Sequence, residues 1–338
     1  MKYIVCKKPG VFEYLEKEAP KKKVGEALVK IHRVGICGTD LHAYSGNQAF
    51  FSYPRILGHE LAATVLEIEA NHQDLKVGDP VAILPYMACQ HCQACIQGKT
   101  NCCENMQVLG VHTDGGMQEI ISIPSAFLLP APHLSLDEIA LIEPLSIAFH
   151  ALRRAGLQKG EHVLVIGCGP IGVGILKLAQ AQGATVVAMD VNAVRLQFAK
   201  KALGIENTVL TGTNAADQCR DFFDGKRADI VFDATGNKKA LETGHHYMSH
   251  GGRYVLVGLY KADLTFLHPE IHAKETSLLC SRNATREDFV SVMDFLASGE
   301  FPTANYITHR VNKAGMIQHF ERWLLPETGV LKAMVAFD

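Results

Sequence analysis

The sequence predicts an α/β protein in which a doubly wound domain is inserted into a β-rich domain. At 338 residues the chain is longer than one ordinary core accommodates, which favours two domains. Short runs of alternating polar and apolar residues, separated by glycine and proline, fill roughly the first 65 residues. From residue 162 onward strands alternate with helices, as in parallel βαβ units. We therefore place the doubly wound domain at 152–283 and the β-rich domain at 1–151 plus 284–338.

The β-rich domain is expected to consist mainly of short antiparallel strands. Period-2 patterning predicts strands at residues 3–6, 27–34 and 61–68, and a turn at 77–80 precedes another strand at 81–83. Gly115-Gly116 forms a turn before a further strand. Apolar residues at helical spacing follow over 136–155, and we expect this helix to be broken at Glu143-Pro144.

The doubly wound domain is expected to alternate strands and helices. Its strands are predicted at residues 162–166, 184–189, 208–210, 230–233, 253–257 and 276–280. Its helices are predicted at residues 170–182, 193–203 and 238–248. Beyond this domain the pattern predicts a helix at 287–298 and a last strand at 332–337.

Composition excludes several classes of protein. The chain is 48% hydrophobic and 20% charged, with a formal net charge of −2, so it carries no field that would recruit nucleic acid or an anionic membrane. No stretch reaches the roughly 20 apolar residues that a membrane-spanning helix needs. The short apolar run at the N-terminus is a first strand and not a signal peptide. We therefore expect a cytoplasmic protein without nucleic-acid or membrane partners.

A glycine fingerprint marks the start of the doubly wound domain. Gly167, Gly169 and Gly172, with Pro170 and Ile171, follow a predicted strand and open a predicted helix. In this context the glycines allow a tight turn, approach of a pyrophosphate and close helix packing, while the helix N-terminus faces the phosphates.

An acidic residue follows the next predicted strand. Asp190 is placed to accept hydrogen bonds from the adenine ribose, and its charge would repel a 2′-phosphate. Arg195, five residues on, could instead accommodate that phosphate, but we expect Asp190 to dominate. The pattern therefore indicates NAD rather than NADP.

Four of the ten cysteines fall in one short window, expected to form a lobe at 86–106. Cys89, Cys92, Cys95 and Cys103 have the spacing of a structural zinc site in a chain without a secretion signal. Cys102 is an adjacent candidate for the fourth ligand, and the chemistry of the first three does not choose between it and Cys103.

A second constellation offers the mixed donors of a catalytic zinc site. Cys37 and His59 supply sulfur and nitrogen, and either Glu60 or Glu143 can supply oxygen. Each residue also has a structural explanation, because a buried histidine or cysteine often serves only packing. Sequence spacing alone does not bring residues 37, 59 and 143 together.

These motifs resemble those of the zinc-containing medium-chain alcohol and polyol dehydrogenases over essentially the whole chain. The landmarks occur in family order: Gly35-Ile36-Cys37-Gly38-Thr39-Asp40-x-His42, Gly58-His59-Glu60, the four cysteines, Glu143-Pro144 and the glycine fingerprint. The resemblance implies a GroES-like catalytic domain interrupted by a Rossmann domain. It also implies one structural zinc with Cys103 as fourth ligand and one catalytic zinc. Glu143, where alcohol dehydrogenases have a cysteine, indicates the sorbitol and threonine dehydrogenase branch, in which either Glu60 or Glu143 binds the metal.

The resemblance also implies roles for residues around the reacting atoms. Thr39 would take the proton of the substrate hydroxyl and His42 would pass it on to solvent, while Asp40 would hydrogen-bond the far nitrogen of His59. Cofactor contacts fall on Val257, Gly258, Leu259, Ser281 and Arg282. The family implies a homodimer or homotetramer.

Three further segments indicate the substrate: residues 46–55, 109–116 and 281–285 resemble dehydrogenases that oxidise hexonates such as L-galactonate. A carboxylate substrate needs a cation, and Arg282 could bind either this carboxylate or the cofactor pyrophosphate, with Lys261 and Arg55 as weaker alternatives. The alternatives are a dehydrogenase acting on a polyol such as sorbitol or on L-threonine. A third hypothesis is a non-catalytic NAD-binding zinc protein.

Overall fold

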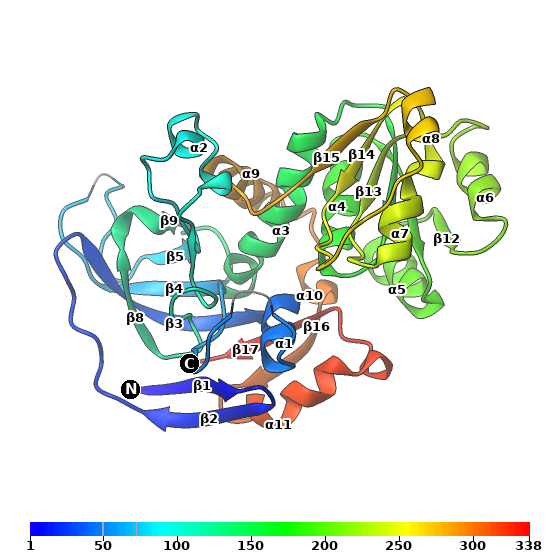
Figure 1. Ribbon diagram of the computed structural model, residues 1–338. Helices are drawn as coiled ribbons and strands as arrows, with labels where there is room; N and C mark the ends of the chain where they lie inside the picture. The colour runs from blue at the N-terminus through cyan, green and yellow to red at the C-terminus, as the bar shows by residue number, and fades with distance from the viewer. Residues whose placement is uncertain (49–50, 72) are drawn as a thin grey trace. The chain divides into compact units, whose positions relative to one another are not determined.

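The computed structural model describes residues 1–48, 51–71 and 73–338, and its contacts divide the chain into two compact units (Figure 1). The first unit comprises Met1–Pro144 and Ala284–Asp338, and the second comprises Leu145–Asn283. Phe50, part of one segment that carries the substrate resemblance, lies outside the described residues. The predicted fold class is confirmed, since the two segments of a β-rich unit precede and follow a doubly wound unit along the chain.

A seven-stranded sheet forms the framework of the first unit, in the order β16-β17-β3-β4-β5-β9 with β8 also paired to β3. Its pairings are antiparallel except for that of β16 with β17. Inward-facing apolar residues such as Ile31, Val34 and Val335 fill one continuous core. The strands are β3 (Glu26–Ile36), β4 (Glu60–Glu67), β5 (Pro80–Ile83), β8 (Ile120–Pro124), β9 (Leu128–Pro130), β16 (Ile307–Asn312) and β17 (Lys332–Ala336).

Smaller elements surround this sheet. Two further strand pairs are β1 (Lys2–Lys8) with β2 (Val11–Glu16), and β6 (Tyr86–Met87) with β7 (Gln107–Val108). The helices are α1 (Gly38–Tyr44), α2 (Gln93–Ile96), α9 (Arg286–Ala297), α10 (Thr303–Tyr306) and α11 (Met316–Phe320). Short 3-10 helices are η1 (Thr100–Cys102), η2 (Ser125–Phe127), η4 (Glu321–Leu324) and η5 (Pro326–Thr328).

Strand register places three chain segments side by side at one end of the sheet. Gly35 of β3 pairs with Glu60 of β4, and Ile36 pairs with Ala333 of β17. A Cβ at position 35 would lie 2.1 Å from Glu60 Oε2, so only glycine fits beside this carboxylate. Because β3 leads directly to Cys37, this register brings residues from both segments of the first unit to one place.

The expected break at Glu143-Pro144 is wrong. A single helix, α3 (Leu136–Ala155), runs through Pro144. Proline removes one helical hydrogen bond and costs about 3 kcal/mol inside a helix. Ile142 and Leu145 on either side are fully buried, and we infer that this burial offsets the cost.

The second unit contains a six-stranded sheet in the order β12-β11-β10-β13-β14-β15, with every pairing parallel. From β10 the chain adds β11 and β12 toward one edge of the sheet. It then returns to β10, pairs β13 with it, and adds β14 and β15 toward the other edge. The strand order therefore reverses between β10 and β13. Ligands bind at the carboxyl ends of the strands near such a reversal. The strands are β10 (His162–Ile166), β11 (Thr185–Asp190), β12 (Thr208–Leu210), β13 (Ala228–Asp233), β14 (Met248–Leu256) and β15 (Ser277–Cys280).

The helices of this unit are α4 (Pro170–Ala181), α5 (Ala193–Leu203), α6 (Ala215–Phe222), α7 (Lys238–Thr243) and α8 (His268–Ala273). The helix expected over 238–248 is shorter than predicted, because α7 ends at Thr243 and a 3-10 helix, η3 (Gly244–Tyr247), follows. The Tyr254 hydroxyl donates to the Leu241 carbonyl at 2.8 Å, which satisfies an acceptor that a longer helix would have used. Among the described helices none has the length and apolar character needed to cross a bilayer.

Candidate metal and dinucleotide sites

The glycine fingerprint forms a tight turn between β10 and α4. Gly167 has a φ of +98°, a conformation that favours glycine. A Cβ at Gly172 would lie 1.8 Å from the Gly167 carbonyl oxygen, so this residue lets the helix pack against the turn. Gly169 caps the helix, and a Cβ there would meet no heavy atom within 4 Å, which leaves space for a phosphate. Pro170 and Ile171 begin α4; because proline has no N–H, the free donors of this first turn are the N–H groups of Ile171 and Gly172.

Asp190 ends β11 beside this turn. Its carboxylate accepts from the backbone N–H of Cys168 at 2.7 Å and from that of Asn192 at 2.8 Å, and it is 5% exposed. A carboxylate has about four acceptor positions, so two remain for ribose hydroxyls. Arg195 is exposed on α5. The turn and the acid therefore fit an adenosine diphosphate group.

The other residues predicted to contact the cofactor also lie at the carboxyl ends of this sheet. The backbone N–H groups of Val257 and Gly258 both donate to the Asp233 carbonyl at 2.9 Å. A Cβ at Gly258 would lie 2.2 Å from the Gly236 nitrogen, so the loops after β13 and β14 touch. Leu259 is 82% exposed. Ser281 follows β15 with a buried Oγ that has no hydrogen-bond partner among the described residues, and Arg282 beside it is exposed.

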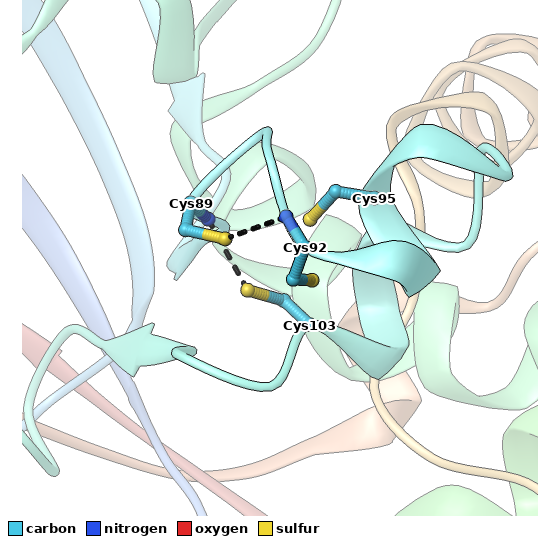
Figure 2. A group of neighbouring side chains, drawn as sticks. All are labelled: Cys89, Cys92, Cys95 and Cys103. Carbon is cyan, nitrogen blue, oxygen red and sulfur yellow. Dashed lines mark hydrogen bonds between the residues drawn. The ribbon is translucent and has the colours of Figure 1, made fainter.

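The four cysteines of the lobe point toward one centre (Figure 2). Their sulfur atoms all lie within 4.8 Å of one another, close to the roughly 3.8 Å separation set by tetrahedral Zn–S bonds. The Cys89 N–H donates to Cys103 Sγ at 3.2 Å, and the Cys92 N–H donates to Cys89 Sγ at 3.4 Å. Cys102 is exposed and outside the group, and Cys103 is the fourth member of it.

The surroundings of the lobe favour a thiolate at Cys89 and a thiol at Cys95. Backbone N–H donors, chiefly that of His91, lower the pKa of Cys89 to about 6. Burial raises the pKa of Cys95 to about 12, so an unmetallated cluster would hold a mixture of thiol and thiolate. A zinc ion would be bound by all four as thiolates, and this donor set fits it.

A second donor cluster lies where β3 gives way to α1 and β4 begins. Ligand atoms of Cys37, His59 and Glu60 all lie within 4.8 Å of one another. Burial alone would lower the pKa of His59, but the thiolate of Cys37 and the carboxylate of Asp40 raise it well above its usual value. Sulfur, nitrogen and oxygen donors thus meet in a buried place that suits a divalent cation.

Asp40 stabilises this cluster by accepting hydrogen bonds from backbone N–H groups, and not by the expected hydrogen bond to His59. Its carboxylate accepts from the N–H of Cys37 at 2.9 Å and from that of Gly58 at 3.1 Å. The distance from Asp40 Oδ1 to His59 Nδ1 is 4.0 Å, so the predicted hydrogen bond to His59 is not formed. That nitrogen has no partner among the described residues. Asp40 therefore holds the backbone at Cys37 and at Gly58, the residue before His59.

A lysine that the sequence interpretation missed completes the cluster. The Lys332 Nζ donates to both carboxylate oxygens of Glu60, at 2.6 and 2.7 Å, and to the Ile36 carbonyl at 3.2 Å. Both charged side chains are 1% exposed. Burial alone would lower the pKa of Lys332, but the charge of Glu60 raises it above its usual value. A single lysine in an otherwise apolar strand was the available signal.

Glu143 lies beside this cluster but outside the three-donor group. The hydroxyl of Tyr86, a second residue that the sequence interpretation missed, donates to Glu143 Oε1. Burial raises the pKa of Glu143 to about 7, although the positive charge of His59 opposes the shift. Of the two glutamates left open by the sequence, the geometry places Glu60 nearer to Cys37 and His59.

The remaining candidates lie on or near α1. Thr39 is half-buried in its first turn and His42 is exposed in its last turn. Arg55, considered for a substrate carboxylate, donates to Ser52 Oγ at 2.9 Å and pairs with Asp114 at 3.4 Å. Arg55 is therefore already engaged by side chains of its own unit.

Comparisons with known proteins place these sites in a family context. A family model described as the alcohol dehydrogenase GroES-like domain matches residues 23–133. A second, described as zinc-binding dehydrogenase, matches residues 170–298.

Whole-chain relatives agree with these matches. The chain is 43% identical to L-galactonate-5-dehydrogenase of Escherichia coli K12, over all of this chain and 99% of that one. Its fold is similar to that of rspB from E. coli CFT073 in complex with NADH, with a TM-score of 0.92, 28% identity and coverage of 100% and 99% of the two chains. The fold is also similar to that of E. coli L-idonate 5-dehydrogenase, with a TM-score of 0.86, 26% identity and coverage of 99% and 98%.

Proposed function

The chain belongs to the zinc-containing medium-chain alcohol and polyol dehydrogenases, and from this premise we propose that it oxidises a secondary hydroxyl of a sugar acid. The enzyme class and the cofactors, zinc and NAD, follow from the family. The substrate proposed is L-galactonate, converted to a keto-hexonate. The observation that carries this choice is the 43% identity to L-galactonate-5-dehydrogenase over the whole chain. The similarity in fold to L-idonate 5-dehydrogenase supports a hexonate as the substrate class.

We assign the catalytic metal site to Cys37, His59 and Glu60, with Glu143 as the alternative oxygen ligand. The three gathered donors support this choice, because a catalytic zinc uses three protein ligands and a fourth position for the substrate hydroxyl. Zinc held there would supply Lewis-acid polarisation of the hydroxyl, and NAD would accept the hydride. Cys89, Cys92, Cys95 and Cys103 would hold the structural zinc.

Buried charges support a divalent cation at the proposed catalytic site. A Cys37 thiolate and the buried carboxylates of Glu60 and Glu143 would leave excess negative charge in a mostly buried region. Lys332 balances one carboxylate by pairing with Glu60, and the Tyr86 hydroxyl stabilises the other by donating to Glu143. Lys332 and Tyr86 would therefore position the two carboxylates and set which of them reaches the metal.

Proton release is assigned to α1. Thr39 would accept the substrate's hydroxyl proton, and His42, exposed at the other end of the helix, would deliver it to solvent. In the second unit Gly167, Gly169 and Gly172 would hold the pyrophosphate and Asp190 the adenine ribose. Arg282 would meet either the substrate carboxylate or the pyrophosphate.

Steady-state kinetics with NAD and a panel of three substrates tests the proposal. We expect kcat/KM for L-galactonate to exceed that for sorbitol and for L-threonine. Good turnover of sorbitol without turnover of L-galactonate would replace the sugar acid by a polyol. Absence of turnover with every substrate, in protein shown to contain zinc and to bind NADH, would favour the hypothesis of a non-catalytic NAD-binding zinc protein.

A further inference from the structure

A third group of metal-binding side chains lies in the second unit, whereas the two metal-donor clusters described above belong to the first unit. His245 and His246 are adjacent on η3, and Glu270 lies on α8. Their ligand atoms all lie within 4.8 Å of one another. We propose that these three residues bind a transition-metal ion of the Zn²⁺ class.

The geometry of the group fits such an ion. The Nε2 atoms of His245 and His246 lie 3.4 and 2.8 Å from the same oxygen, Oε2 of Glu270. Bonds of about 2.0–2.1 Å in a tetrahedral zinc site separate neighbouring ligand atoms by roughly 3.3 Å. The first distance already has this value, and the second needs to open by roughly 0.5 Å. Two imidazoles and one carboxylate form an open zinc site, with a fourth position left for water.

His245 lacks a satisfactory partner within the protein. It is 2% exposed, its Nδ1 has no hydrogen-bond partner among the described residues, and its Nε2 has only the 3.4 Å contact with Glu270. A metal bond would give the poorly partnered Nε2 a strong ligand, while Nδ1 would stay without a partner.

Two cations fix the backbone that carries the histidines. Lys274 Nζ donates to the His245 carbonyl at 2.7 Å and to the Met248 carbonyl at 3.1 Å. Arg227 donates to the His246 carbonyl at 2.6 Å. These bonds hold η3 in place before a metal binds. Their positive charges also oppose a divalent ion, so the site binds zinc more weakly than the four-thiolate lobe does.

The fourth position has room for water or a small ligand. A cavity of about 620 Å³ adjoins the group and is lined by His245, Phe266, His268, His272 and Thr276 among other residues. Because η3 precedes β14 and α8 precedes β15, the group lies at the amino ends of these parallel strands. The proposed NAD contacts lie at their carboxyl ends, so this site is separate from the cofactor site.

Zinc titration of the purified full-length protein, followed by equilibrium dialysis and metal analysis, tests the proposal. Wild type is expected to bind one exchangeable zinc more than the His246→Asn and Glu270→Gln variants do. Each variant should lower the affinity for that zinc by more than about 100-fold, since loss of a residue that only hydrogen-bonds a ligand already lowers metal affinity by up to that much. Mg²⁺ should not replace zinc, because it prefers oxygen ligands.

Two matched variants control for general effects. Glu275→Gln removes an acid that lines the same cavity, and His133→Asn removes an exposed histidine of the first unit. Both should keep the additional zinc. Equal zinc binding by wild type and the two ligand variants would overturn the proposal, as would equal loss in the controls. The comparison between variants does not depend on turnover, so it stands apart from the proposed substrate.

Discussion

Lys332 donates to both carboxylate oxygens of Glu60, at 2.6 and 2.7 Å, in a region from which water is excluded. The two residues are 272 positions apart in the chain and meet because β17 and β4 both pair with β3. The pair joins the two chain segments of the first unit at the proposed catalytic metal site.

Replacing Lys332 by methionine should destabilise the protein by about 3–5 kcal/mol, because it leaves Glu60 buried without a countercharge. Urea unfolding of the purified protein measures the change. The Glu60→Gln, Lys332→Met double variant should recover a large part of the loss, since both charges are then gone. A single-variant loss below about 1 kcal/mol would show that the pair behaves like an exposed salt bridge.

The glycine turn gives a second prediction. Gly172→Ala should weaken NADH binding by at least about tenfold, a loss of about 1.4 kcal/mol, because its Cβ would collide with the Gly167 carbonyl and displace the turn. Fluorescence titration gives the Kd. Gly212→Ala is the matched control, since its Cβ would meet only Leu210 O at 3.9 Å. Equal Kd values for the two variants would remove this turn from the cofactor site.

The cysteine lobe allows a comparison between neighbours. Cys103→Ser should release one zinc per chain and lower the Tm, because binding of a structural zinc contributes to folding stability. Cys102→Ser should change neither, since this thiol is exposed and outside the group. Metal analysis and thermal unfolding of both variants make the test. Zinc loss from Cys102→Ser instead would reassign the fourth ligand.

Stability should depend on the protonation of His32. Burial, with help from Lys30 and Arg33, lowers the pKa of His32 below its ordinary value of 6.5, and its Nε2 contacts Thr64 Oγ1 at 2.9 Å. The unfolded chain therefore binds the proton more tightly. The contribution of neutral His32 is complete above pH 6.5 and is lost as the pH falls below it.

The variant His32→Gln removes this titration and serves as the reference. Between about pH 7.5 and 5 the free energy of unfolding should fall more steeply in wild type than in the variant. Urea unfolding at several pH values gives both curves. Parallel curves would show that His32 titrates normally in the folded protein.

Local patterns predicted much of the fold. Strand-helix alternation identified the parallel sheet, because each strand is a short apolar run bounded by turns. The helix through Pro144 was missed because local propensity opposes it while burial of Ile142 and Leu145 favours it. The early end of α7 depends on the Tyr254 hydroxyl, a contact across the fold that spacing does not encode.

The proposed sites were predictable to different degrees. The four cysteines are close in sequence, so their spacing alone indicated a common ligand. Cys37 and His59 are brought together by the β3–β4 register, and Lys332 arrives from the last strand. Only the family resemblance anticipated that Cys37 and His59 would meet. The single lysine in the apolar last strand was a signal of a special role for Lys332, but it did not show that Glu60 is its partner.

The most direct test of the account is NADH formation from L-galactonate by wild type and by Cys37→Ser. Metal analysis and NADH binding first establish that the variant keeps the zinc of the cysteine lobe and the cofactor site. The account predicts one NADH per L-galactonate oxidised by wild type. It also predicts that kcat/KM is lower in the variant by at least about a thousandfold, because Lewis-acid stabilisation is worth several kcal/mol. Failure of wild type to oxidise L-galactonate, or an undiminished rate in Cys37→Ser, would contradict it.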